Sequence, residues 1–276
     1  MSTSKPAAAA RPHRRPVVRR AVTTVTATGL VLAGAGLLSP AAHAAESDIS
    51  FSAVSLNKGK PIVVGTSGEV EVPLTYTVKS KVALDSWWIK GYRGAYGKFG
   101  ERDLPAIATR WSVRTSHAGG YTFRDCSESL TIASRELVNA DATTWKTAGT
   151  AIKKDSGYDT DLLSASFRLQ RASRIQSASA SPTVVTKGKA ITVSGTVQRA
   201  NWTSHRYDSY GGTSVRLQFK PVGSSTYTTV KTVTATSTGH LKTTATASKD
   251  GTWRWFYGGN SITGASSSTG KYVDVR

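Results

Sequence analysis

Cys126 is the residue of this chain whose chemistry best fits covalent catalysis, and His117 lies nine residues before it. An imidazole that removes the proton of a nearby thiol produces a nucleophilic thiolate. Asp125, however, stands directly beside the thiol, and its negative charge opposes thiolate formation. The spacing of His117, His205 and His240 matches neither a metal triad nor a helical zinc-protease motif. We therefore predict no catalytic residue and no enzyme. We expect Cys126 to lie unpaired on a strand, and an intermolecular disulfide stays open as the alternative.

A short acidic segment contains three carboxylates, Asp155, Asp159 and Asp161, around a glycine. Carboxylate oxygens are ligands that calcium prefers, so the three side chains together are the candidate metal site of the chain. Their spacing is not that of an EF-hand loop, and two lysines stand next to the first of them. A solvated turn before the next strand is the favoured interpretation. We expect no cofactor, with calcium at these three residues as the alternative.

A second group of candidate residues combines aromatic rings with arginines between two predicted strands. It consists of Arg199, Trp202, Arg206, Tyr207 and Tyr210. Exposed rings stack on sugar faces or bases, and guanidinium groups pair with phosphate or carboxylate. Loops at the end of a β-sandwich are common places for such recognition. The sequence therefore predicts a ligand-binding loop here, with the alternative that Trp202 folds back as a lid on the sandwich.

Alternation of apolar and polar residues predicts that β-strands position these groups. Strands are expected in the first half at 49–54, 61–64, 70–78 and 162–169, and in the second half at 183–186, 190–197, 215–220, 227–235, 241–247, 253–257 and 272–275. Residues 91–120 are expected to form long loops, and 136–154 fit a short helix or a bulged strand. Trp253 and Trp255 are expected in the core of the second half, because they share one face of a strand.

A stretch of small polar residues at 171–181 predicts a linker between a domain at 45–170 and a domain at 182–276. Seven short strands separated by turn residues are typical of a β-sandwich. The strands therefore predict an all-β chain. That it forms two tandem Ig-like antiparallel sandwiches is what the family resemblance described next implies, and a cleavable signal peptide is expected before them.

Five segments of the second half resemble an Ig-like module of secreted actinobacterial proteins whose function is unknown. They are Lys187 to Gly195, Val215 to Lys220, Tyr227 to Val233, Gly251 to Trp255 and Tyr272 to Val275. The first half resembles the Ig-like or fibronectin-like partner module of the same proteins. The resemblance implies tandem Ig-like domains outside the cell, and some relatives are labelled calcium-binding. It implies no catalytic residue.

The charge of the chain is strongly positive, with 36 Lys and Arg against 17 Asp and Glu and a formal net charge of +19. Residues 1–44 have a basic start, an apolar segment and Ala42-His43-Ala44 at the end, which is the pattern of a signal peptide. Residues 180–276 contain 12 Lys and Arg but only three acids. A positive surface outside a cell favours acidic polymers as partners.

The sequence thus predicts a secreted, non-enzymatic binding protein, extracellular or associated with the cell wall. Its expected partner is an anionic polymer such as teichoic acid or an acidic polysaccharide, with no specific nucleic acid and no transmembrane segment. Two alternatives stay open: an extracellular calcium-binding protein, and a secreted hydrolase of cell wall or polysaccharide with an unrecognised site. The oligomeric state is not predicted.

Overall fold

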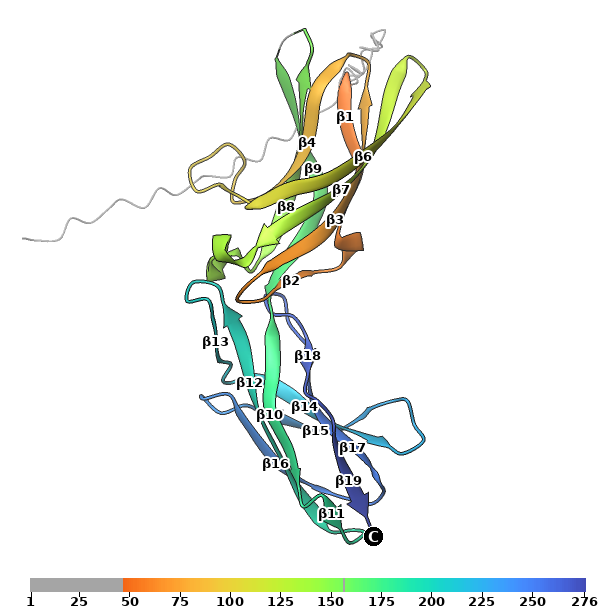
Figure 1. Cartoon of the computed structure of the whole chain (residues 1–276). Coiled ribbons are helices and arrows are strands. Elements are labelled where there is room, and N and C mark those ends of the chain that lie inside the picture. The colour runs from red at the N-terminus through yellow and green to blue at the C-terminus, as the bar shows by residue number, and fades with distance from the viewer. Residues whose placement is uncertain (1–46, 156) are drawn as a thin grey trace, which may run out of the picture. The chain divides into compact units, whose positions relative to one another are not determined.

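A computed structural model describes residues 47–155 and 157–276, without the side chains of 109–111 (Figure 1). The described residues form one compact unit. The predicted signal peptide lies outside the described residues. In the described part of the chain, no helix is long and apolar enough to cross a membrane.

The first sandwich is built from two sheets that face each other. One sheet has the order β1 (Ile49–Leu56), β3 (Glu69–Ser80), β7 (Tyr121–Ala133) and β6 (Ala106–Ala118). The other has the order β2 (Ile62–Val64), β9 (Tyr158–Arg171), β8 (Thr144–Lys153), β4 (Leu84–Arg93) and β5 (Arg102–Asp103). Three short 3-10 turns connect strands: η1 (Asn57–Gly59), η2 (Ser134–Glu136) and η3 (Asn139–Asp141).

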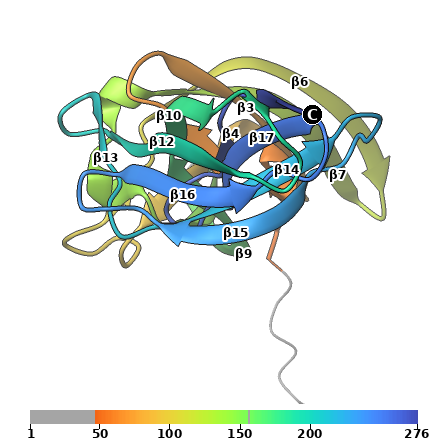
Figure 2. The same ribbon diagram turned by 90° about the horizontal axis from the view of Figure 1, so that it is seen from below.

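The second sandwich has the same two-layer construction. In one sheet β12 (Ala190–Asn201) pairs with β10 (Ser173–Ser181), with β13 (Arg206–Ser209) and with β16 (His240–Thr246). Figure 2 shows β12 and β16 side by side. The other sheet has the order β11 (Val184–Val185), β19 (Lys271–Val275), β17 (Gly251–Tyr257), β14 (Ser214–Pro221) and β15 (Thr228–Thr234), with β18 (Ser266–Ser267) beside β17.

The order of the strands identifies both sandwiches as Ig-like. If the long strands of the first are lettered A to G along the chain, one sheet reads A-B-E-D and the other G-F-C, which is the immunoglobulin arrangement. In the second sandwich the corresponding strands give A-B-E from β10, β12 and β16, and G-F-C from β19, β17 and β14. The predicted all-β fold with two tandem Ig-like sandwiches is therefore confirmed.

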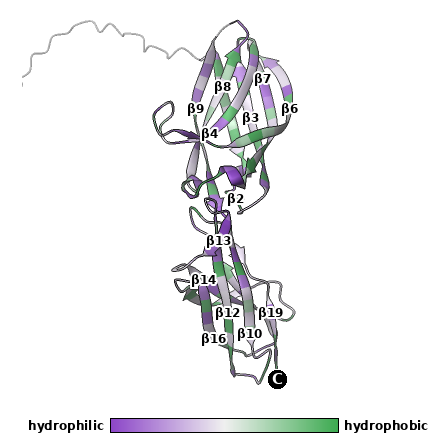
Figure 3. Ribbon diagram, turned by 60° about the vertical axis from the view of Figure 1, so that its left-hand side comes forward, coloured by the Kyte–Doolittle hydropathy of each residue, from purple (hydrophilic) through white to green (hydrophobic). Residues whose placement is uncertain are grey.

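Alternating burial explains why these segments form strands. Along β12 buried and part-buried residues alternate over most of its length, and Figure 3 shows hydrophobic and hydrophilic residues alternating along it. One face of such a strand packs on the core while the other faces solvent. In the second sandwich Trp255 is fully buried and its indole N–H donates to the carbonyl of Ser194 at 3.0 Å. Trp253 is 3% exposed, which confirms that both tryptophans belong to the core.

Three sequence predictions about the elements need correction or completion. The predicted linker at 171–181 is mostly strand β10, the first strand of the second sandwich, and only Ala172 separates it from β9. The predicted loops at 91–120 contain the 13-residue strand β6. Residues 136–154 form a 3-10 turn and then strand β8. The pairing of β8 with β9 shifts register between Lys146 and Thr147, and the two residues skipped there, Ser164 and Ala165, belong to β9. The strand alternative is therefore correct for 136–154, but the bulge lies in the neighbouring strand.

The first strand of each sandwich carries the same irregularity. In β1 the pairing with β3 shifts between Ser52 and Ser55, and Ala53 has a φ of 51°. In β10 the pairing with β12 shifts between Gln176 and Ser179, where the φ of Ser177 is also 51°. A bulge with one residue in the left-handed region bends a strand at the edge of a sheet. The repetition supports the assignment of β10 as the counterpart of β1.

Candidate functional site

The predicted aromatic loop is the hairpin that joins β12 to β13. Its turn is held by Asn201, whose side-chain oxygen accepts hydrogen bonds from the backbone N–H groups of Thr203 at 3.0 Å and Ser204 at 3.1 Å. Its side-chain amide donates to a carboxylate oxygen of Asp208 at 2.6 Å. Asparagine is favoured in such turns because its short amide replaces a backbone partner. The turn therefore fixes the direction of the next residue, Trp202.

Trp202 is a buried residue and does not serve as an exposed stacking platform. It is 0% exposed and belongs to the hydrophobic core of the first sandwich. Its indole N–H donates to the carbonyl of Val64 at 3.2 Å, and its backbone N–H donates to the side-chain oxygen of Asn139 at 2.9 Å. The prediction of a ligand contact is wrong for this residue, because the first sandwich covers the indole that the loop presents.

The two predicted tyrosines are part-buried, and the chain's own arginines cover their rings. The guanidinium carbon of Arg174 lies 4.0 Å from the ring centre of Tyr207, and that of Arg199 lies 4.3 Å from the ring centre of Tyr210. Such cation–π contacts occupy one face of each ring. Arg206 is the exposed member of the predicted group. The structure thus brings the five residues near one hairpin but leaves few free ring faces.

The three carboxylates of the predicted metal site do not assemble into a ligand set. Asp159 and Asp161 lie on β9 opposite Ala151 and Gly149 of β8. A carboxylate oxygen of Asp161 accepts a hydrogen bond from the backbone N–H of Phe51 at 3.3 Å, which gives it a structural role. Among the described residues no group of three or more His, Cys, Asp or Glu side chains could hold a metal ion. The described residues therefore do not bring Asp155, Asp159 and Asp161 together as one set of ligands, and calcium binding there stays a prediction from the sequence.

Cys126 and His117 do not form a nucleophile pair. Cys126 on β7 faces Val113 of β6, four residues from His117, which corresponds to about 13 Å along a strand. The thiol is 2% exposed and accepts a hydrogen bond from the indole N–H of Trp87 at 3.2 Å. Burial raises the pKa of the Cys126 thiol, and the charge of Asp125 adds to the effect. The thiol is consequently an inert core group.

A different surface combines positive charge with aromatic rings, on the solvent side of strands β14 and β17. We call it the cationic row, and it consists of Arg216, Phe256, Arg254, Tyr227 and Lys220. The inward neighbours of its strand residues, such as Leu217 and Trp255, are fully buried, so the row lies on the opposite face. Arg216 is directly opposite Phe256 in the sheet.

Cations and rings alternate along the row. The guanidinium carbon of Arg216 lies 4.7 Å from the ring centre of Phe256, and that of Arg254 lies 5.8 Å from the same ring. On its other side Arg254 lies 3.7 Å from the ring centre of Tyr227, and the ammonium of Lys220 is 5.2 Å from that ring. The Nε of Arg254 also donates to the side-chain oxygen of Gln218 at 2.9 Å, which fixes its orientation. The row is therefore ordered by contacts among its own members.

The row carries three positive charges that no carboxylate of the described residues neutralises by an ion pair. Two acids at the neighbouring strand end are engaged elsewhere: Asp250 accepts from the backbone of Val275 at 2.7 Å, and Asp274 pairs with Arg276 at 2.9 Å. Sequence reasoning missed the row. The signal was present in the outward positions of 215–220 and 253–257, but only the pairing of β14 with β17 brings them together.

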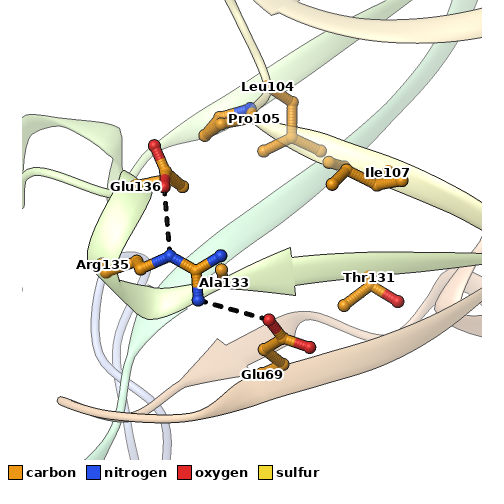
Figure 4. A pocket seen from close by; sticks show the side chains of 9 residues that line it. Glu69, Leu104, Pro105, Ile107, Thr131, Ala133, Arg135 and Glu136 are labelled. Carbon is orange, nitrogen blue, oxygen red and sulfur yellow. Dashed lines mark hydrogen bonds and ion pairs between the residues drawn. The ribbon is translucent and has the colours of Figure 1, made fainter.

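A shallow pocket of about 290 Å³ lies on the first sandwich between the ends of β3, β6 and β7 (Figure 4). Arg135 crosses its lower rim and contacts Glu69 at 3.4 Å and Glu136 at 3.3 Å. Leu104 and Ile107 form the opposite, apolar side. Because the arginine already has two carboxylate partners, the pocket offers no convergent set of free polar groups that would fix a ligand.

Neither a protein-family model nor a curated protein matches the chain. Among solved structures it is similar to the D00-D0 domain of intimin, at 16% identity over 80% of this chain and 98% of that one, with a TM-score of 0.26. It is also similar to the fibronectin(III)-like modules of Clostridium thermocellum CbhA, at 12% identity over 80% of this chain and 92% of that one, with a TM-score of 0.31. At these identities and TM-scores the likeness carries no argument about function.

Proposed function

We propose that this chain is an exported, non-enzymatic binding protein that associates with anionic polymers of the cell envelope or its surroundings. The observation that supports the proposal is the cationic row, in which Arg216, Lys220 and Arg254 alternate with two aromatic rings and have no ion-pair partner in the described residues. Guanidinium groups suit carboxylate or phosphate, and the rings that these cations contact hold them in place.

The outer face of the sheet fits an extended ligand better than a small one. Residues on one face of a strand repeat every two positions, at about 6.6 Å, so Arg216 and Lys220 are spaced over about 13 Å. A polymer with an acidic group on each repeating unit meets such a row at several points. Teichoic acid and acidic polysaccharides both have this property, and both are extracellular, as the predicted signal peptide requires.

The test is sedimentation of the exported chain, residues 45–276, with insoluble acidic polysaccharide and separately with teichoic-acid-containing cell wall. A triple variant, Arg216→Gln, Lys220→Gln and Arg254→Gln, removes the charges of the row. Exposed charge contacts contribute about 0.5–1 kcal/mol each, so we expect the affinity to fall roughly 10- to 100-fold. Binding should also weaken with added salt, because exposed charges are screened over about 8 Å at physiological ionic strength.

The matched control is Lys187→Gln, Lys189→Gln and Lys242→Gln, which removes three exposed charges outside the row. We expect this variant to keep most of the affinity. Equal losses in the two triple variants would show that net charge alone drives binding, and would contradict the assignment to the row. Cleavage of either polymer by the purified chain would contradict the non-enzymatic part of the proposal.

A further inference from the structure

The side chain of Arg171 is buried, and its Nε has no hydrogen-bond partner. Arg171 is the last residue of β9 and is 8% exposed, and its Nε is buried and unsatisfied. Its backbone is fixed on both sides, since its N–H donates to the carbonyl of Ile262 at 3.0 Å and its carbonyl accepts from Gly264 at 2.9 Å. No ion pair of the described residues includes it. A buried charge without a partner is costly, which raises the question of what compensates it.

A second guanidinium group points to the same place. Thr263 is the bridge partner of Arg171 and is fully buried, and its hydroxyl lies 3.5 Å from an Nη of Arg199 on β12. Burial lowers the pKa of Arg171, and the positive charge of Arg199 lowers it further. Two cations and a hydroxyl therefore converge where β9 meets the segment that follows β17.

The neighbouring Tyr210 contacts one of the two arginines directly. Arg199 covers the ring of Tyr210, and the Tyr210 hydroxyl accepts a hydrogen bond from the amide of Asn260 at 3.0 Å. Burial alone raises the pKa of Tyr210, but hydrogen bonds from Tyr257 and Thr263 and the charge of Arg199 leave it below its ordinary value. The hydrogen bonds contribute most to this lowering, and the positive charge of Arg199 adds to it.

The nearest carboxylate only partly offsets the two arginines. Asp208 lies opposite Arg199 in the backbone pairing of β12 with β13. Its negative charge raises the pKa of Arg171, but this effect is the smallest of the contributions. Its carboxylate accepts the side-chain amide of Asn201 at 2.6 Å and makes no ion pair with either arginine. The cluster is thus left with more positive than negative charge in a largely buried position.

We propose that Arg171 and Arg199, with the hydroxyl of Thr263, form a binding site for an oxyanion of the phosphate type. Phosphate carries between one and two negative charges at neutral pH, which matches the charge left uncompensated, and its oxygens accept the forked N–H groups of arginine. The anion is either free phosphate or the phosphate group of a larger molecule. This site is separate from the cationic row, and its failure would leave the proposed function intact.

The experiment is thermal unfolding of the chain 45–276 in increasing inorganic phosphate, with sodium chloride adjusted to keep the ionic strength constant. A ligand that binds only the folded state raises the melting temperature. We expect a saturable rise of a few degrees for the unchanged protein. Arg171→Met and Arg199→Gln should each abolish the rise, whereas Arg206→Gln, which removes an exposed charge of the same hairpin, should retain it.

The variants also differ in their expected stability without phosphate. Arg171→Met should melt no lower than the unchanged chain in chloride, because it replaces an unpaired buried charge by an apolar chain of similar length. If that variant fails to fold, the Arg199→Gln result and phosphate titration of the unchanged chain by calorimetry decide the question. The absence of a phosphate response in the unchanged chain, or an equal response in all variants, would overturn the proposal.

A second titration identifies the source of the anion. If phosphate and glycerol 1-phosphate both raise the melting temperature, the site accepts the phosphate group of a larger molecule. A response to phosphate alone assigns the site to the free anion. Either result supports the site.

Discussion

Replacing Trp202 by alanine tests whether the β12–β13 hairpin is anchored in the first sandwich. The indole is 0% exposed and donates one hydrogen bond to Val64. Truncation of a buried tryptophan costs about 3–5 kcal/mol, and the lost hydrogen bond adds about 1 kcal/mol. With an unfolding slope of about 2 kcal/mol per molar urea, the midpoint should fall by roughly 2–3 M. The loss should affect the first sandwich, whose core contains the indole.

The assay is urea unfolding of the chain 45–276 followed by circular dichroism, with Trp88→Ala as the control. Trp88 is on β4 of the same sandwich and is 40% exposed, so its truncation should move the midpoint much less. Trp253→Ala should destabilise the second sandwich instead. If Trp202→Ala and Trp88→Ala shift the midpoint equally, Trp202 is not an anchor, and its role as a ligand platform returns.

Two further predictions concern Glu128, which is part-buried, and Cys126, which is buried, on β7. Burial raises the pKa of Glu128, so the folded state favours its protonated form. The contribution of Glu128 to stability should be largest below the ordinary glutamate pKa of about 4.3. It should be lost as the pH rises through the folded-state value, as measured by unfolding midpoints between pH 4 and 8. Glu128→Gln should flatten this dependence, and an unchanged slope would show that another group is responsible. Cys126 should react with a thiol reagent much more slowly in the native state than in urea, because burial raises its pKa and blocks access. Equal rates would contradict its burial.

Strands with a one-sided hydrophobic pattern could be predicted from the sequence, and strands without one could not. β3 alternates strictly because one face packs on the core, and its prediction was correct. β6 lies at the edge of its sheet and pairs only with β7, so its strand conformation depends on backbone hydrogen bonds to that neighbour. β10 also lacks a one-sided hydrophobic pattern, because only Ile175 and Ala180 are buried there. Its small polar residues therefore looked like a linker.

The functional predictions depended on contacts between distant segments. Trp202 looked exposed because its neighbours in sequence are polar, whereas its covering partner, Val64, lies 138 residues away. The cationic row required the register of β14 against β17, which sets Arg216 opposite Phe256. The alternation of each strand was visible in the sequence, but alternation alone does not give strand pairing.

One parallel strand pair in each sandwich has a consequence for its response to mechanical tension. In the first, β2 near the start runs parallel to β9 at the end, with Ile62 opposite Leu169 and Val64 opposite Arg171. In the second, β11 runs parallel to β19. A force that pulls the two ends of a sandwich apart slides such strands along each other, so their hydrogen bonds are loaded together and do not open one at a time. The parallel pairs β2 with β9 and β11 with β19 are therefore loaded in shear under such a force.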